Sequence, residues 1–253
     1  MRRFVPIARA VFPGARKIPP PGLPRPGAPC AIMASMSRFA TLLLDLDGTL
    51  VDAFTTIHRG YCHALPRLGR PAPTMEQVRR AVGGGIHQAM AHFLPPDKIA
   101  EGVALHVAYS DSILLEDVTL MPGAMELLRA QHAAGVALAV FTNKRGEHAR
   151  RICDHLGLTP LLRGVFGARD TPWLKPQPEF AAHVLAQIGA RADSTLLVGD
   201  SPFDVQAAHH GGFPCWCVTT GTHDAAALRA AQADAVFPDL VALQRALAAA
   251  PAR

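Results

Sequence analysis

The 253-residue sequence lacks any apolar run long enough to cross a membrane. A spanning helix needs about 18 or more consecutive apolar residues, whereas the apolar stretches here are short segments such as 42–44 and 136–141. We therefore expect neither a membrane protein nor a membrane partner. Because 49% of the residues are apolar and only 18% are charged, the composition also excludes a chain that is disordered throughout.

Cysteine is scarce and odd in number, with five residues scattered along the chain. Such a set does not form the disulfide framework of a secreted domain, so we expect a reducing compartment and a cytoplasmic protein. Cys215 and Cys217 are separated by one residue, whereas a CxxC metal-binding motif has two residues between its cysteines. No second pair of cysteines exists. They are therefore predicted to be buried residues of a strand.

Acidic residues are missing from the first 38 positions, which hold seven Lys and Arg and eight Pro. The remaining chain carries 18 Lys and Arg against 20 Asp and Glu, so the basic charge belongs to this segment alone and a nucleic-acid partner is not expected. We predict a disordered, basic, proline-rich tail over 1–37. Three origins stay open: an over-long start with Met33 or Met36 as the true first residue, an organelle transit segment, or a functional arm.

Short apolar segments alternate with helical patterns over most of the chain after the tail. This alternation, with short links, is typical of an α/β fold in which helices cover both faces of a doubly wound parallel sheet. Strands are predicted at 41–46, 136–141, 164–166, 195–198 and 215–218, and helices at 122–134, 146–156, 178–188, 203–210 and from 225 onward.

A block of helical periodicity interrupts the alternation after the first strand. Ile57, Tyr61 and Leu65 share one helical face, and residues 74–77 have the form of a capping box. We therefore predict an all-helical insert. The expected division of the chain is a core of 38–53 and 118–253 with a helical cap of 54–117.

Polar side chains follow three of the predicted strands. Asp45 and Asp47 come after the apolar residues 42–44 of the first, Thr142 after the second and Asp200 after the fourth, while Lys175 precedes a proline-marked helix. Ligands of such sheets bind beyond the carboxyl ends of the strands, where the strand order reverses, so these groups are expected to converge. Asp45 and Asp200 offer the oxygens that Mg²⁺ prefers, and Lys175 and Thr142 suit the oxygens of a phosphoryl group.

Asp45 and Asp47 are spaced so that they project from the same side of an extended chain. With this spacing the two carboxylates can take different roles in one reaction. Asp45 can attack phosphorus as a nucleophile, and Asp47 can protonate the leaving oxygen and later accept a proton from water. Gly48 permits the sharp turn that lets backbone donors approach the substrate.

Four motifs in this order resemble those of haloacid dehalogenase (HAD) superfamily hydrolases. The resemblance covers about 38–247 and implies a HAD-like Rossmannoid core with a small helical cap inserted after the first strand. The matching residues are Asp45-x-Asp47-Gly48-Thr49, Thr142, Lys175 and Gly199-Asp200-Ser201-x-x-Asp204.

The resemblance implies a Mg²⁺ cofactor and a covalent mechanism. Asp45 would be the phosphate-accepting nucleophile and Asp47 the general acid and base. The metal would be held by Asp45, by Asp47 through its backbone carbonyl, and by Asp200.

The resemblance also implies a set of phosphate-binding residues. Thr142, the Asn143 amide and Lys175 would hold the phosphoryl group, and Asp204 would brace metal-bound waters or Lys175 from behind. Lys144 is expected to be a solvated surface residue, with gating of the cleft as the alternative that stays open, and none of the twelve histidines is assigned a role.

Among capped members of the superfamily, the chain looks most similar to phosphoglycolate phosphatases, through residues 68–71, 82–85, 142–144 and 174–176. This similarity implies a Mg²⁺-dependent phosphatase that acts on a small phosphorylated metabolite, 2-phosphoglycolate. A β-phosphoglucomutase-like sugar-phosphate mutase and a phosphatase for a nucleotide, sugar phosphate or pyrophosphate stay open as alternatives. A phosphorylation-controlled receiver module is excluded, because the chain is about twice as long as one plain domain of that kind. The sequence predicts no oligomeric state.

Overall fold

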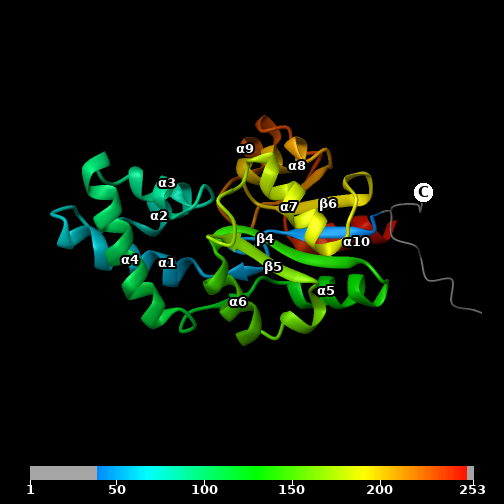
Figure 1. Ribbon diagram of the computed structural model, residues 1–253, viewed down its shortest axis with the longest axis horizontal. Coiled ribbons are helices and arrows are strands. Elements are labelled where there is room, and N and C mark those ends of the chain that lie inside the picture. Colours follow the sequence, from blue (N-terminus) through cyan, green and yellow to red (C-terminus); the bar gives the residue numbers. More distant parts are fainter. Residues whose placement is uncertain (1–38, 250–253) are drawn as a thin grey trace, which may run out of the picture. The chain divides into compact units, whose positions relative to one another are not determined.

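The computed structural model describes residues 39–249, and these residues form an α/β structure around one parallel sheet (Figure 1). The six strands lie in the order β5-β4-β1-β6-β7-β8. This confirms the predicted doubly wound fold, while the predictions for the tail and for residues 250–253 lie outside the described residues. The strands are β1 (Thr41–Leu44), β4 (Ala137–Arg145), β5 (Gly164–Ala168), β6 (Thr195–Gly199), β7 (Cys215–Val218) and β8 (Ala235–Phe237).

Helices cover both faces of the sheet because its strands are apolar on both sides. Leu42 and Leu44 of β1 point into one hydrophobic cluster and Leu43 points into the other, and all three are fully buried. One face packs against α5 (Ala124–Ala133), α6 (Gly146–His155) and α10 (Leu240–Ala249), and the other against α7 (Pro178–Ile188), α8 (Pro202–His210) and α9 (Ala225–Ala230).

The strand order reverses between β1 and β6. These two strands pair in parallel with Leu44 opposite Val198, so the loops that follow them leave the sheet side by side. The first of these loops carries Asp45 and the second carries Asp200. The topology therefore brings two distant acidic segments to the position where open α/β sheets bind ligands.

The segment between β1 and α5 is helical apart from a short antiparallel pair where the chain leaves and returns. That pair joins β2 (Val51–Asp52) to β3 (Thr119–Leu120). The insert has its own apolar cluster, which includes Tyr61, Val78 and Met90. Its helices are α1 (Phe54–Arg67), α2 (Met75–Ala81), α3 (Ile86–Ala91), η1 (Pro96–Lys98) and α4 (Ile99–Ile113).

Several local features that the sequence predicts are present in the structure. The capping box of α2 is present, because Gln77 N donates to Thr74 Oγ1 at 3.2 Å and Thr74 N donates to Gln77 Oε1 at 2.8 Å. Cys215 and Cys217 are buried on β7, as expected, and neither forms a disulfide. No helix within 39–249 is long and apolar enough to cross a membrane.

Two differences from the predicted elements concern the ends of strands and helices. β4 continues past the apolar run to Arg145, which extends the strand through the polar residues of the site. The helix expected from Ala225 onward ends at Ala230 and is followed by β8 and α10. Helix-favouring alanines on both sides conceal this three-residue strand in the sequence.

Candidate active site

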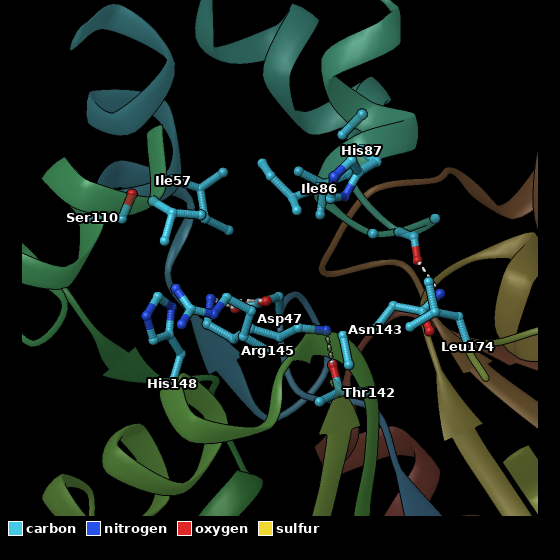
Figure 2. A pocket seen from close by; sticks show the side chains of 18 of the residues that line it. Asp47, Ile57, Ile86, His87, Ser110, Thr142, Asn143, Arg145, His148 and Leu174 are labelled. Carbon is cyan, nitrogen blue, oxygen red and sulfur yellow. Dashed lines mark hydrogen bonds and ion pairs between the residues drawn. The ribbon is translucent and has the colours of Figure 1, made fainter. Parts of the chain in front are cut away.

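A cavity of about 320 Å³ lies between the carboxyl edge of the sheet and the helical insert (Figure 2). Its core side is lined by five of the predicted site residues, and its other side by residues of the insert. Two further predicted residues, Lys175 and Asp204, are buried behind this lining. The predicted site residues on the cavity wall are Asp45, Asp47, Thr142, Asn143 and Asp200.

Lys175 forms the centre of a buried ion-pair chain behind the cavity. Its Nζ donates to Asp45 Oδ1 at 2.7 Å and to Asp204 Oδ1 at 2.6 Å. The lysine is 3% exposed and Asp204 is fully buried. The other oxygen of Asp45, Oδ2, accepts no hydrogen bond from residues 39–249. Asp45 is therefore oriented through one oxygen while the second remains available to a ligand.

The carboxylate of Asp204 is hydrogen-bonded to neighbouring residues through both of its oxygens. Its Oδ2 accepts hydrogen bonds from Ser201 Oγ at 2.6 Å, from Ser201 N at 3.1 Å and from Asp200 N at 3.3 Å. Because Oδ1 is bound to Lys175, both oxygens of Asp204 are engaged. This carboxylate positions the lysine and the loop after β6.

Asp200 is held by two threonines that come from different loops. Thr49 Oγ1 donates to Asp200 Oδ1 at 3.2 Å, while the amide and the hydroxyl of Thr222 each donate to Oδ2 at 2.7 Å. Thr49 belongs to the first motif. Thr222, in the loop after β7, was not predicted as a site residue, and no motif marks it in the sequence.

Asp45, Asp200 and Asp204 form a carboxylate cluster whose ligand atoms lie within 4.8 Å of one another. Burial raises the pKa of Asp45 to about 6; the ion pair with Lys175 opposes this shift and Asp204 adds to it. Burial and the two neighbouring carboxylates raise the pKa of Asp200 well above its usual range. Burial alone would lower the pKa of Lys175, but Asp204 and Asp45 outweigh it and raise that pKa.

The donor set of this cluster fits a hard divalent cation. One ammonium group faces three buried carboxylates, so the side chains leave negative charge uncompensated. All of the candidate ligand atoms are oxygens, which Mg²⁺ prefers. Asp204 lies behind the cavity wall with both oxygens hydrogen-bonded, whereas Asp45 and Asp200 line the cavity, so these two are the carboxylates that a metal could reach.

Two glycines let the backbone approach the cluster closely. Gly48 has φ +88°, and a Cβ there would lie 2.7 Å from Asp200 Oδ2. A Cβ at Gly221 would overlap the same oxygen. The carboxylate of Asp200 therefore sits in a cradle that only glycine can form.

We expect Gly221→Ala to lower kcat/KM on a phosphate monoester by about 100-fold or more, because the new methyl group must displace the carboxylate of Asp200, a predicted metal ligand. The change should raise the Mg²⁺ concentration needed for half-maximal rate, which a Mg²⁺ titration measures. Circular dichroism serves as the control for folding. A folded variant with the Mg²⁺ dependence of the wild type would contradict this explanation.

The two phosphate-binding candidates on β4 differ in the donors that they can offer. Thr142 Oγ1 accepts from Lys144 N at 3.2 Å, so its O–H remains free to donate. The side chain of Asn143 is fully engaged: Nδ2 donates at 2.9 Å to Gly83 O and at 2.9 Å to Lys175 O, and Oδ1 accepts from Lys175 N at 2.8 Å. Asn143 therefore ties the insert to the Lys175 loop, and its side-chain amide has no N–H left for a phosphoryl group.

The expectation that Lys144 is a solvated surface residue was wrong. Its Nζ lies 3.1 Å from both carboxylate oxygens of Asp47, and both side chains are largely buried. The reason is the extension of β4, which carries Lys144 over the cavity instead of into a solvent-exposed turn. Its position two residues after Thr142 was the available signal, since alternate residues of a strand share a face.

The carboxylate of Asp47 stands apart from the carboxylate cluster. It lines the cavity beside Lys144, and the group of close ligand atoms does not include it. A metal-binding role for Asp47 therefore depends on its backbone carbonyl, as the family resemblance implies, and this role stays a prediction.

Two of the polar contacts between the insert and the core involve Gly83 and Arg79. Gly83 O accepts from Asn143, as described above, and Arg79 NH1 donates to Gly221 O at 3.4 Å while its guanidinium lies over the ring of Phe54. The glycine loop 83–85 lines the cavity.

The comparisons with known proteins agree with this site. The family model for haloacid dehalogenase-like hydrolases matches residues 42–218. This range spans all four motifs, from the strand before Asp45 to the end of β7.

Relatives and solved structures of similar sequence include several phosphoglycolate phosphatases. The chain is 32% identical over 212 residues to one from Pseudomonas putida, covering 80% of this chain and 77% of the relative. It is 31% identical over 186 residues to one from Rhodobacter capsulatus, covering 71% and 84%. A crystal structure described as a predicted phosphoglycolate phosphatase from Haemophilus somnus matches with a TM-score of 0.76 at 26% identity, covering 83% of this chain and 99% of that one.

Proposed function

Because the chain belongs to the haloacid dehalogenase-like hydrolases and is a phosphoric monoester hydrolase, we propose that it is a Mg²⁺-dependent phosphatase whose reaction passes through a phosphoaspartate. The proposed substrate is a small phosphorylated metabolite, 2-phosphoglycolate. The observation that carries this proposal is the orientation of Asp45, which lines the cavity and is fixed through Oδ1, while Oδ2 accepts no hydrogen bond from residues 39–249.

Asp45 is the proposed nucleophile. Oδ2 attacks phosphorus, the P–O bond to the leaving group breaks, and an acyl phosphate forms. The hydroxyl of Thr142 and the amides of Leu46 and Asp47 are available as donors for the phosphoryl oxygens, since none of the three donates to an acceptor within residues 39–249. Lys175 holds Asp45 in place and contributes positive charge where negative charge develops.

Asp47 is the proposed general acid and base. Its carboxyl group gives a proton to the leaving alkoxide in the first step and accepts one from the attacking water in the second. The position of this carboxylate on the cavity wall, where Lys144 holds it, is what supports the role.

Asp45, Asp200 and the backbone carbonyl of Asp47 would hold the Mg²⁺, which neutralises charge on the phosphoryl group when it is bound. Asp204 would act through Lys175 and the Asp200 amide, to which it is hydrogen-bonded. This role matches its saturated carboxylate better than direct ligation would.

We also propose that the helical insert acts as a cap. Residues 54–117 would open to admit substrate and close over the core formed by 38–53 and 118–253. The contacts of Gly83 and Arg79 with the core support a closed arrangement in this structure. Closure would exclude water other than the nucleophile from the cavity.

The direct test is phosphate release from 2-phosphoglycolate, hexose phosphates, nucleotides and pyrophosphate, with and without Mg²⁺. We expect Mg²⁺-dependent release, with 2-phosphoglycolate having the highest kcat/KM. An isomerised hexose phosphate without free phosphate would instead identify a mutase. If another ester has the highest kcat/KM, the protein is still a phosphatase, but the proposal that its substrate is 2-phosphoglycolate is wrong.

Mg²⁺ should stabilise the protein more near pH 8 than near pH 5. The raised pKa values of Asp45, about 6, and of Asp200 mean that protons compete with the metal at the lower pH. At about 100 times its Kd, a ligand adds about 2.7 kcal/mol to the free energy of unfolding. Thermal unfolding in EDTA and in excess Mg²⁺ measures this gain, and equal gains at both pH values would contradict the assignment of these two ligands.

A further inference from the structure

The cavity continues past Asp47 to polar side chains that the proposed mechanism does not use. Arg145, at the end of β4, and His148, on α6, lie beside Asp47 on the core side, and Ser110 of α4 lies across the cavity from them (Figure 2). Sequence reasoning singled out none of these residues. We call Arg145 and His148 the anion subsite.

The guanidinium of Arg145 has hydrogen-bond donors without acceptors. Its side chain is only 18% exposed, and Nε and NH1 are buried without a hydrogen-bond partner. NH2 donates to Glu147 at 3.4 Å, and NH1 lies 3.6 Å from Asp111 Oδ1, which is too long for a hydrogen bond. Buried donors that stay unpaired destabilise a fold, so a ligand that supplied acceptors here would bind favourably.

The insert side of the cavity also offers polar atoms without partners. The hydroxyls of Thr56 and Tyr61 are buried on α1, line the cavity, and form no hydrogen bond. Polar groups without partners on two facing walls indicate a polar ligand between them. The positive charge of Arg145 indicates that the nearer end of this ligand is anionic.

A carboxylate of the chain itself already contacts the anion subsite. Asp111 of α4 is hydrogen-bonded to His148 Nε2 and ion-paired with Arg145. Its side chain is 44% exposed and comes from the insert, so it can move away without disturbing the core. The subsite is therefore complementary to a carboxylate in both charge and hydrogen bonding.

We propose that Arg145 and His148 bind the carboxylate of the substrate in place of Asp111, and that this contact selects phosphate monoesters with a carboxylate close to the ester oxygen. The inference rests on the proposed function and adds to it the residues that choose among substrates. Arg145 is a specificity residue, whereas the reacting atoms are handled by Asp45 and Asp47.

The test compares 2-phosphoglycolate with 2-hydroxyethyl phosphate, which has the same length and a neutral end. We expect the wild type to favour 2-phosphoglycolate in kcat/KM by about 10- to 100-fold, the range for a charge-assisted contact. Arg145→Gln should remove this preference by lowering kcat/KM on 2-phosphoglycolate, chiefly through KM, with less than about 3-fold change on the neutral ester.

The matched control is Arg151→Gln, which removes an exposed arginine of α6, the helix that carries His148, and should leave kcat/KM on both esters unchanged. Asp111→Asn should lower KM for 2-phosphoglycolate alone, because the competing carboxylate is gone. A rise in KM for both esters in this variant would overturn the displacement of Asp111.

The outcomes separate this inference from the proposed function. Equal losses on both esters in Arg145→Gln would overturn the subsite, and so would an unchanged preference. If that variant does not fold, the wild type decides the question. A wild-type kcat/KM that is about equal for 2-phosphoglycolate and 2-hydroxyethyl phosphate would overturn the proposal. Failure of the wild type to hydrolyse any monoester would overturn the proposed function itself.

Discussion

Asp45→Asn is expected to lower kcat on every phosphate monoester by at least about 10⁴-fold, the scale seen when a covalent nucleophile is removed. The amide cannot form the acyl phosphate. The fold should survive, because Asn has the shape of Asp and Lys175 keeps its contact with Asp204 at 2.6 Å. The measurement is phosphate release under saturating substrate and Mg²⁺, with the melting temperature recorded in parallel.

Asp193→Asn provides the matched control. Asp193 is an exposed aspartate paired with Arg191 far from the cavity, and its replacement should leave kcat unchanged. A second readout uses the wild type alone: acid quenching during turnover should trap a phosphoryl group on the protein that hydroxylamine releases. A folded Asp45→Asn enzyme that retained more than about a tenth of the wild-type rate would exclude the covalent route.

The sequence predicts those parts of the site that depend only on neighbouring residues in the chain. Asp45 and Asp200 follow strongly apolar strands, and parallel strands bring their carboxyl ends to the same edge of a sheet. This reasoning predicts the parallel sheet and the meeting of two loops that are 155 residues apart. It needs no knowledge of side-chain conformation.

The parts that the sequence does not predict depend on long-range geometry. The pairing of Lys144 with Asp47 follows from the exact end of β4, and a strand end cannot be fixed from a polar run. Thr222 supports Asp200 from a loop without a motif. The contact of Asp111 with His148 depends on how the insert sits over the core, which helical periodicity does not contain.

Asn143 shows, within one motif, what the sequence predicts and what only the structure reveals. The residue type and its place after Thr142 indicate a site residue. Only the observed bonds to Gly83 and Lys175 separate a side chain that binds phosphate from one that joins loops.

Lys175→Met should have the largest effect on stability among single changes at the site. It removes the one ammonium group from the carboxylate cluster and leaves buried negative charge without its partner. Breaking a buried ion pair from one side costs about 3–5 kcal/mol. We also expect a fall in kcat of about 10²- to 10³-fold, because Asp45 loses its orienting contact and the phosphoryl group loses a positive charge.

The loss of stability in Lys175→Met should grow with pH. The folded-state pKa of Asp45 is already about 6, against about 3.9 for an unfolded Asp, although Lys175 opposes the shift. Without the lysine, that pKa moves higher. A group with a raised folded-state pKa contributes stability that is present below the unfolded value and lost as pH rises through the folded value. The destabilisation should therefore be smaller near pH 5 than near pH 8.

Urea unfolding in EDTA at the two pH values measures this difference, with Lys98→Met as the control. Lys98 is an exposed lysine paired with Glu101, so its replacement should leave both midpoints unchanged. Mg²⁺ should restore part of the stability of Lys175→Met near pH 8, because the cation would supply positive charge to the same carboxylates. A loss that is equal at both pH values and insensitive to Mg²⁺ would mean that Lys175 acts through packing alone, and that the carboxylate cluster is not a cation site.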